Sequence, residues 1–160
     1  MAFYNDMIPQ NFEPKRAFRW VIEYEGLDTF LAQTATRPKI TVGETEFNFL
    51  NFVSYFAGKA RPETFTISLV DAIDPSQVKK AFDWMSTVYN FNTGKAHGKD
   101  FYAKDIVLKL LGPEGEIIEK WTLKNAWPVN FNPSDLDYNS EEFATVELTL
   151  RYDKAVLEEI

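Results

Sequence analysis

The sequence predicts an antiparallel β domain with a single α-helix. Three observations lead to this fold class. Aromatic residues make up 16% of the chain, and aromatic side chains favour the pleated surface of a sheet. Apolar and polar residues alternate in several segments, as they do in strands with one buried face. Only one segment has the three- and four-residue apolar spacing of an amphipathic helix.

The composition indicates one domain over residues 1–160. A chain of this length buries roughly two-thirds of the surface that its unfolded form exposes. The formal net charge is −7, and an acidic chain is poorly suited to bind the phosphate backbone of nucleic acids. The absence of cysteine excludes disulfides and thiolate metal sites. There is no apolar run of the roughly 18 residues that span a bilayer, and the N-terminus lacks the order of a secretory signal.

The N-terminal part predicts an arm followed by a hairpin. Residues 1–17 contain two prolines and few periodic apolar positions, which indicates an irregular arm. Large apolar residues at every second position over 18–24 predict a strand. Residues 26–28 predict a turn into a second strand over 29–36, and Pro38 then ends the predicted hairpin.

Residues 39–61 are rich in phenylalanine, and two interpretations remain open. The segment forms either two short strands joined across the edge of a sheet, or a long loop whose aromatic tip docks on a neighbour. Long loops are usually functional or disordered, and this composition argues against disorder. A docking loop or hairpin over residues 39–61 is therefore expected, against the alternative of ordinary core packing. The candidate docking residues are Phe47, Phe49, Phe52, Tyr55 and Phe56.

The one predicted helix covers residues 74–91. Asp74 is expected as its N-cap, Pro75 occupies the first helical position, and Gln77 is placed as a capping-box partner. Apolar residues then recur on one face, and the Asn-Thr-Gly sequence at 92–94 ends the helix.

Alternating patterns predict further strands on both sides of this helix. They cover residues 63–71, 101–111, 116–124 and about 143–152. Residues 112–115 are a strong turn signal. Pro128 predicts a sheet edge or the end of a strand, because proline cannot donate to a ladder.

No residue set predicts catalysis, a metal site or a cofactor. His97, the only histidine, lies in a loop without a residue to orient it and is expected to be solvated. The acidic residues between Asp135 and Glu142 lack the spacing of a calcium loop. The two Gly-Lys pairs in the 94–99 loop lack the order of a phosphate-binding loop.

The last strand has two contrasting faces. Its apolar face is expected to be buried, whereas the opposite face carries Thr145, Glu147, Thr149 and Arg151. This polar face either meets bulk water on the outside of a sandwich or lines a wet channel when several copies close into a barrel. The residues alone do not separate these interpretations.

From Trp121 to Asp153 the chain has an apolar strand, a Trp-Pro pair, an acidic-aromatic turn and a strand that ends in Tyr-Asp. This order resembles the C-terminal signature of bacteriophage tail tube proteins from contractile, myovirus-type tails. The residues that carry it are Trp121, Trp127, Pro128, Asp135, Asp137, Tyr138 and Tyr152. The opening strand, the midchain helix and the glycine-containing loop also follow the layout of that family.

The resemblance implies a β-sandwich or barrel-like subunit that forms hexameric rings. Stacked rings would make the inner tail tube, with a continuous β-barrel lumen that conducts DNA without binding it specifically. The four polar residues of the last strand would face the lumen. The implied partners are further copies of the chain, the tail sheath protein, and the baseplate initiator and tail terminator proteins. The implied location is the virion tail, after synthesis in the host cytoplasm, with no cofactor and no enzymatic activity.

Two alternatives stay open at this point. Tubes of type VI secretion and R-type bacteriocins share the fold that the resemblance implies, so the kind of injection system is not fixed. A β-barrel carrier of a small apolar ligand belongs to another class, and it predicts a stable monomer with apolar residues pointing into a cavity.

Overall fold

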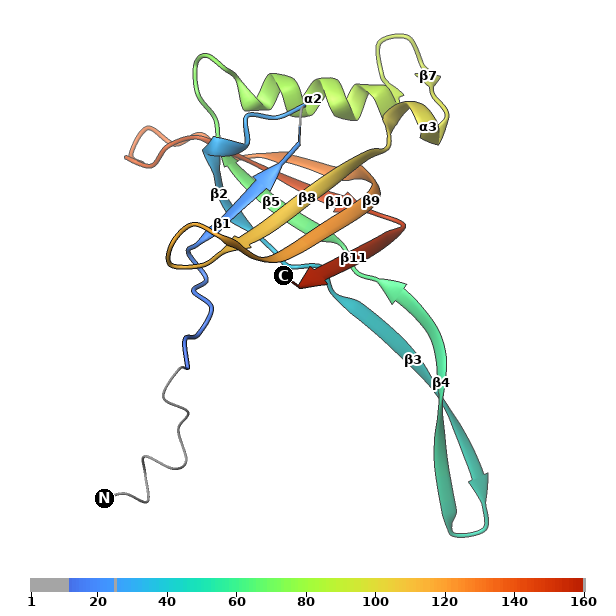
Figure 1. Ribbon diagram of the computed structural model, residues 1–160. Helices are drawn as coiled ribbons and strands as arrows, with labels where there is room; N and C mark the ends of the chain where they lie inside the picture. Colours follow the sequence, from blue (N-terminus) through green and yellow to red (C-terminus); the bar gives the residue numbers. More distant parts are fainter. Residues whose placement is uncertain (1–11, 25, 160) are drawn as a thin grey trace, which may run out of the picture.

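Figure 1 shows the computed structural model of the chain, which describes residues 12–24 and 26–159. Seven antiparallel strands form one sheet in the order β1–β8–β9–β10–β5–β2, with β11 paired to β9. These strands are β1 (Trp20–Glu23), β2 (Ala32–Ala35), β5 (Phe65–Val70), β8 (Lys104–Leu111), β9 (Ile117–Pro133), β10 (Thr145–Arg151) and β11 (Lys154–Glu159). The predicted fold class, mainly β with antiparallel strands, is confirmed.

Strand β9 belongs to two halves of this structure. Up to Ala126 it pairs with β8 and β11, and from Trp127 onward it pairs with β10. We name β1–β8–β9–β11 the first sheet and β9–β10–β5–β2 the second sheet. At the crossing point Asn125 has a φ of 56°, a left-handed conformation that asparagine adopts more readily than most residues.

The expectation that Pro128 ends a strand is wrong, although its edge position is confirmed. Pro128 is fully buried inside β9 and lies opposite Leu150. The pairing with β10 shifts register between Thr149 and Leu150, which leaves Val129 as an extra residue of β9. A bulge of this kind accommodates proline in a sheet. Among the described residues this half of β9 pairs with β10 alone, so it is also an edge.

The predicted hairpin of residues 18–36 does not form. β1 pairs with β8, placing Trp20 opposite Leu110, and β2 pairs with β5. The connection between β1 and β2 contains the buried side chain of Leu27 and a 3₁₀ turn, η1 (Thr29–Leu31). It is longer than the two- to five-residue loop of a tight hairpin, so the two strands join different sheets.

The core lies between the inner faces of the two sheets. The first sheet contributes Ile22, Ile106, Leu108 and Leu123, and the second contributes Phe65, Ile67, Leu69, Val146, Leu148 and Leu150. These residues occupy every second position of their strands, as the period of a half-buried strand requires.

Helix α2 (Gln77–Val88) packs on β9 and β10 and buries Ala81 and Trp84 in the core. It is shorter than the predicted 74–91. The N-cap is Ser76, whose hydroxyl accepts from the Lys79 amide at 3.3 Å, rather than Asp74. Nothing in the described ranges 12–24 and 26–159 is a helix with the length and apolar character needed to cross a membrane.

Two extra amides at the start of α2 are satisfied from outside the helix. The carboxylate of Asp71 accepts from the backbone amides of Gln77 and Val78 at 2.9 and 3.2 Å. Asp71 thus supplements the Ser76 cap, and Asp74 and Pro75 lie in the loop before the helix. The chain after the helix forms β6 (Tyr89–Asn90), β7 (Lys95–Ala96) and the single turn α3 (Lys99–Tyr102), so the turn at 92–94 closes a small hairpin.

Residues 40–62 form a long two-stranded hairpin of β3 (Ile40–Phe49) and β4 (Phe52–Pro62), which projects from the body on the side away from α2 (Figure 1). It continues the pairing of β2 with β5. Ala35 lies opposite Ile67 and Ile40 lies opposite Pro62, which is nearly the same register. The ten residues of β3 reach roughly 34 Å.

Candidate functional site

The distal part of the β3–β4 hairpin has one aromatic face. Directly paired residues of an antiparallel ladder lie on the same face, and the hairpin pairs Phe47 with Ser54 and Phe49 with Phe52. Alternation along β4 adds Phe56, which lies opposite Thr45. All four phenylalanines are more than half exposed. The core-packing interpretation of this segment is therefore wrong, and of the two forms expected for a docking segment the structure has the hairpin, built from two long strands.

Tyr55, the fifth candidate docking residue, lies opposite Glu46 on the other face of the hairpin. That face also carries Val53 opposite Asn48. The structure thus separates the predicted set into four phenylalanines that share a surface and one tyrosine that does not.

The root of the hairpin is fixed to the end of β10. Arg151 donates from its guanidinium to the Pro62 carbonyl at 3.4 Å, and the hydroxyl of Tyr152 donates to the Lys39 carbonyl at 3.4 Å. Tyr152 is buried, and burial raises its pKa above the ordinary tyrosine value. Both strands of the hairpin are therefore held by adjacent residues of one strand end.

The outer face of the second sheet is polar. Thr149 of β10 lies between Thr66 of β5 and Asn130 of β9, and Glu147 lies in the next row between Ser68 and Asn132. These rows show the alternation expected for the last strand. Thr145 and Thr149 are half-buried, whereas Glu147 and Arg151 are exposed. The face offers hydroxyl and amide groups with one acidic and one basic side chain on β10.

The signature residues of the C-terminal segment divide into packing and loop residues. Trp127 and Tyr102 meet edge to face with ring centroids 5.6 Å apart, and Pro128 and Tyr152 are buried. Asp135, Asp137 and Tyr138 are exposed in the connection between β9 and β10.

The remaining signature residue, Trp121, lies beside a buried carboxylate that the sequence analysis missed. Glu119 accepts from Lys15 at 3.0 Å and from the Trp121 indole at 2.9 Å, and Arg37 lies at 3.7 Å. Burial acts to raise the pKa of Glu119, but these hydrogen bonds and positive charges outweigh it, so the pKa is lowered. Glu119 thereby ties the end of the N-terminal arm to the segment that leads into β3. The only sequence signal for its burial was its position in β9, where it occupies the same face as apolar residues two positions away.

The other predicted features lie on the surface. His97 is exposed in the loop before α3 and contacts the ring of Phe101, with centroids 4.5 Å apart. In residues 12–24 and 26–159, no group of three or more His, Asp or Glu side chains is arranged to hold a metal ion. Residues 1–11 of the predicted arm lie outside the described residues.

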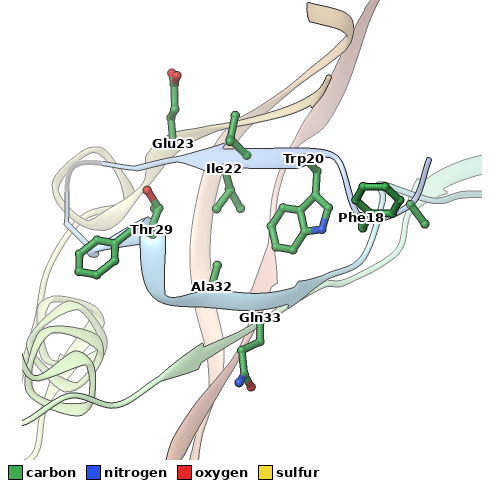
Figure 2. Close-up of a pocket in the computed structure, with 10 residues that line it drawn as sticks. Phe18, Trp20, Ile22, Glu23, Thr29, Ala32 and Gln33 are labelled. Atoms are coloured by element: carbon green, nitrogen blue, oxygen red, sulfur yellow. The ribbon is translucent and has the colours of Figure 1, made fainter. Parts of the chain in front are cut away.

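One prominent cleft among the described residues is open to solvent rather than enclosed. It has a volume of about 920 Å³ and lies between β1 and β2, the two end strands of the sheet (Figure 2). Trp20, Ile22 and Ala32 line it. Between the sheets, the core side chains of the described residues pack against one another, which does not favour a carrier of a small ligand.

The fold and these surfaces agree with the comparisons to known proteins. Residues 16–156 match the protein family described as "T4-like virus tail tube protein gp19". The chain belongs to this family. The tail tube protein of Serratia phage KSP90 is 27% identical over 128 residues, which are 79% of this chain and 72% of that protein.

Solved tube structures confirm the fold of this tail tube family member. The sheath–tube complex of the extracellular contractile injection system PVC matches with a TM-score of 0.74 at 18% identity, over 94% of this chain and 95% of the other. The cap of the anti-feeding prophage matches with a TM-score of 0.74 at 20% identity over the whole of both chains. Hcp1 from Flavobacterium johnsoniae is more distant, with a TM-score of 0.53 at 14% identity, over 89% of this chain and 96% of that one. Tail tube proteins are structural proteins of the virion tail, and the carrier alternative is not favoured.

Proposed function

We propose that six copies of this chain form a ring, and that stacked rings form the inner tube of a contractile tail through which DNA reaches the host. Membership of the tail tube family carries this proposal. The matched proteins include a sheath–tube complex, a tube-terminating cap and a baseplate, which supports the tail sheath, the terminator and the baseplate as partners. The role is structural, without catalysis or a cofactor, and the protein is made in the host cytoplasm before it enters the virion.

The outer face of the second sheet lines the lumen in this proposal. Its threonine, serine and asparagine rows are wettable, and they lack a cluster of lysine or arginine that would retain phosphate groups. DNA would slide along such a wall. The free edges of β2 and of the second half of β9 would pair with neighbouring copies, because an unpaired edge strand needs a partner or a cover.

The absence of cysteine permits a direct test of the lumen wall. Thr149→Cys places a thiol on the outer face of the second sheet, and Thr122→Cys places a matched half-buried thiol on the first sheet. Both variants are assembled and then treated with a maleimide attached to a large polymer. We expect Thr122→Cys to react in tubes and Thr149→Cys to be protected, although both react in the unassembled chain. Equal reactivity in tubes would contradict the assignment.

The phenylalanine face of the hairpin docks on the adjoining ring. Phe47, Phe49, Phe52 and Phe56 expose an apolar surface at a distance of roughly 20–34 Å from the body, measured along β3. A monomer gains nothing from this exposure, whereas a partner that covers it gains hydrophobic burial.

Negative-stain electron microscopy and light scattering test ring formation and docking together. Wild-type chain is expected as rings of six times its 18.5 kDa mass and as hollow tubes of uniform width. Phe49→Asp with Phe52→Asp should leave folded rings that no longer stack. The matched control, Asn48→Asp with Val53→Asp, places the same charges on the opposite face of the hairpin and should still give tubes. Normal tubes from the phenylalanine variant would refute the docking role.

A further inference from the structure

Two exposed patches lie at the two ends of helix α2. The first, which we name the aromatic knob, comprises residues 89–104 after the helix. It exposes Tyr89 and Phe91, whose ring centroids lie 4.9 Å apart, and Phe101 beside His97. Its charged residues are Lys95, Lys99, Asp100 and Lys104, so the knob is basic.

The second patch, which we name the acidic loop, comprises residues 134–143 between β9 and β10. Leu136, Tyr138 and Phe143 are 92%, 108% and 78% exposed. The loop contains Asp135, Asp137, Glu141 and Glu142 and no lysine or arginine. It combines apolar side chains with negative charge, as the knob combines them with positive charge.

Both patches are attached firmly to the helix. The Asp71 amide donates to the Ala144 carbonyl at 2.9 Å, and the Asp71 carboxylate caps the start of α2, so the acidic loop is rooted at the N-terminal end. At the other end, the indole of Trp84 donates to the Tyr102 carbonyl at 2.9 Å, which roots the knob. The twelve residues of α2 place the two patches roughly 18 Å or more apart. Figure 1 shows them on opposite sides of the molecule.

One chain cannot bring these two surfaces together, but two copies can. We propose that the aromatic knob of each subunit docks on the acidic loop of the next subunit within the same ring, an inference that rests on the ring proposed above. The contact is head-to-tail, and repeated contacts of this kind close into a ring when the rotation between copies permits it. Opposite charges set the pairing and its direction, and the exposed aromatic and leucine side chains supply apolar burial.

Charges of these signs also suit the dipole of α2, which favours acidic groups at its start and basic groups at its end. The dipole does not explain the exposed Phe91, Leu136 and Tyr138. Contact between copies accounts for both the charges and the apolar surface.

Charge reversal tests the pairing. The knob variant is Lys95→Glu with Lys104→Glu, which leaves Lys99 in its 2.5 Å ion pair with Asp153. The loop variant is Asp135→Lys with Glu141→Lys and Glu142→Lys, which makes the loop basic and leaves the Asp137 carboxylate to accept the Asn139 amide. Each variant alone should need at least about tenfold more protein for half-assembly into rings, because like charges then meet at every contact.

Mixing the two variants should restore rings. In an alternating ring every contact again joins opposite charges, and alternation closes only when the number of subunits is even, as six is. The readout is native mass spectrometry, which also counts the two chain types. The control, Lys79→Glu with Lys154→Glu, makes the same net charge change as the knob variant at other exposed positions and should assemble like wild type. Melting temperatures identify any variant that fails to fold.

The outcomes separate this inference from the proposed ring. Wild-type chain that never forms rings would contradict the proposed function itself. Rings from wild type and from both single variants would overturn the pairing alone. Rings that form but no longer stack would overturn the pairing within a ring. They would instead assign the knob to the contact between rings, where it would bind the hairpin that bears Glu44 and Glu46.

Discussion

The hydroxyl of Tyr152 donates to the carbonyl of Lys39, which joins the end of β10 to the residue that precedes β3. The neighbouring Arg151 reaches Pro62 at the end of β4. Each strand of the projecting hairpin is therefore held by one hydrogen bond from the end of β10. Its direction is set at the root, because β3 and β4 pair with each other along the distal part of the hairpin.

Tyr152→Phe should loosen the hairpin without unfolding the body. Loss of one hydrogen bond leaves the Lys39 carbonyl without this donor, at a cost of about 0.5–1.5 kcal/mol. Amide hydrogen exchange should become faster in β3 and β4 and stay unchanged in β10. Tyr138→Phe, which removes a fully exposed hydroxyl, is the control. Unchanged exchange in the hairpin would show that Tyr152 does not support it.

Asp71→Ala should destabilise the chain more than Asp74→Ala. The Asp71 carboxylate accepts two amides at the start of α2, and loss of a cap costs about 0.5–2 kcal/mol. Asp74 lies outside the helix, so its removal should change the free energy of unfolding by no more than about 0.5 kcal/mol. Urea unfolding of both variants measures the difference, and the reverse order would restore the sequence-based assignment of Asp74.

The buried Glu119 should make stability depend on acid. Its pKa is lowered below the ordinary value of 4.5 in the folded chain, so the unfolded chain takes up its proton first as the pH falls. The stabilisation is therefore present at neutral pH and is lost as the pH falls through the folded-state pKa. Thermal unfolding is measured from pH 7 down to pH 3. The difference in melting temperature between wild type and Glu119→Gln should become smaller as the pH falls. Glu114→Gln in the exposed turn is the control, and a constant difference would exclude this linkage.

Asn125 should tolerate glycine better than valine. Its φ of 56° lies in the left-handed region, where a β-branched residue costs of order 1–3 kcal/mol and glycine costs little. Asn125→Gly still loses the side-chain bond to Asp153 at 2.9 Å, so wild type should be the most stable. Thermal melting ranks the three chains, and a valine variant as stable as the glycine variant would show that the backbone at residue 125 is not strained.

The local alternation of residues was sufficient to predict most of the strands and the fold class. It could not predict their partners. The turn signal at 26–28 indicated a hairpin, but β1 pairs with β8, where Trp20 and Leu110 lie opposite each other. Long-range pairing of this kind leaves no local trace in the sequence.

The candidate surfaces were predicted unevenly for the same reason. The aromatic content of residues 39–61 predicted a docking segment, but the register that puts four phenylalanines on one face depends on a turn at Leu50 and a bulge near Gly43. The Asp71 carboxylate follows a strand and caps a helix that begins six residues later. Glu119 pairs with Lys15 and Arg37, which are distant from it along the chain. Sequence spacing does not reveal such contacts.

Because β9 is a member of both sheets, the two halves of the subunit are joined by an unbroken covalent backbone as well as by packed side chains. A push on one sheet reaches the other along the stiff axis of a single extended strand. In the proposed tube, each subunit would then transmit thrust during contraction without sliding its two sheets past each other.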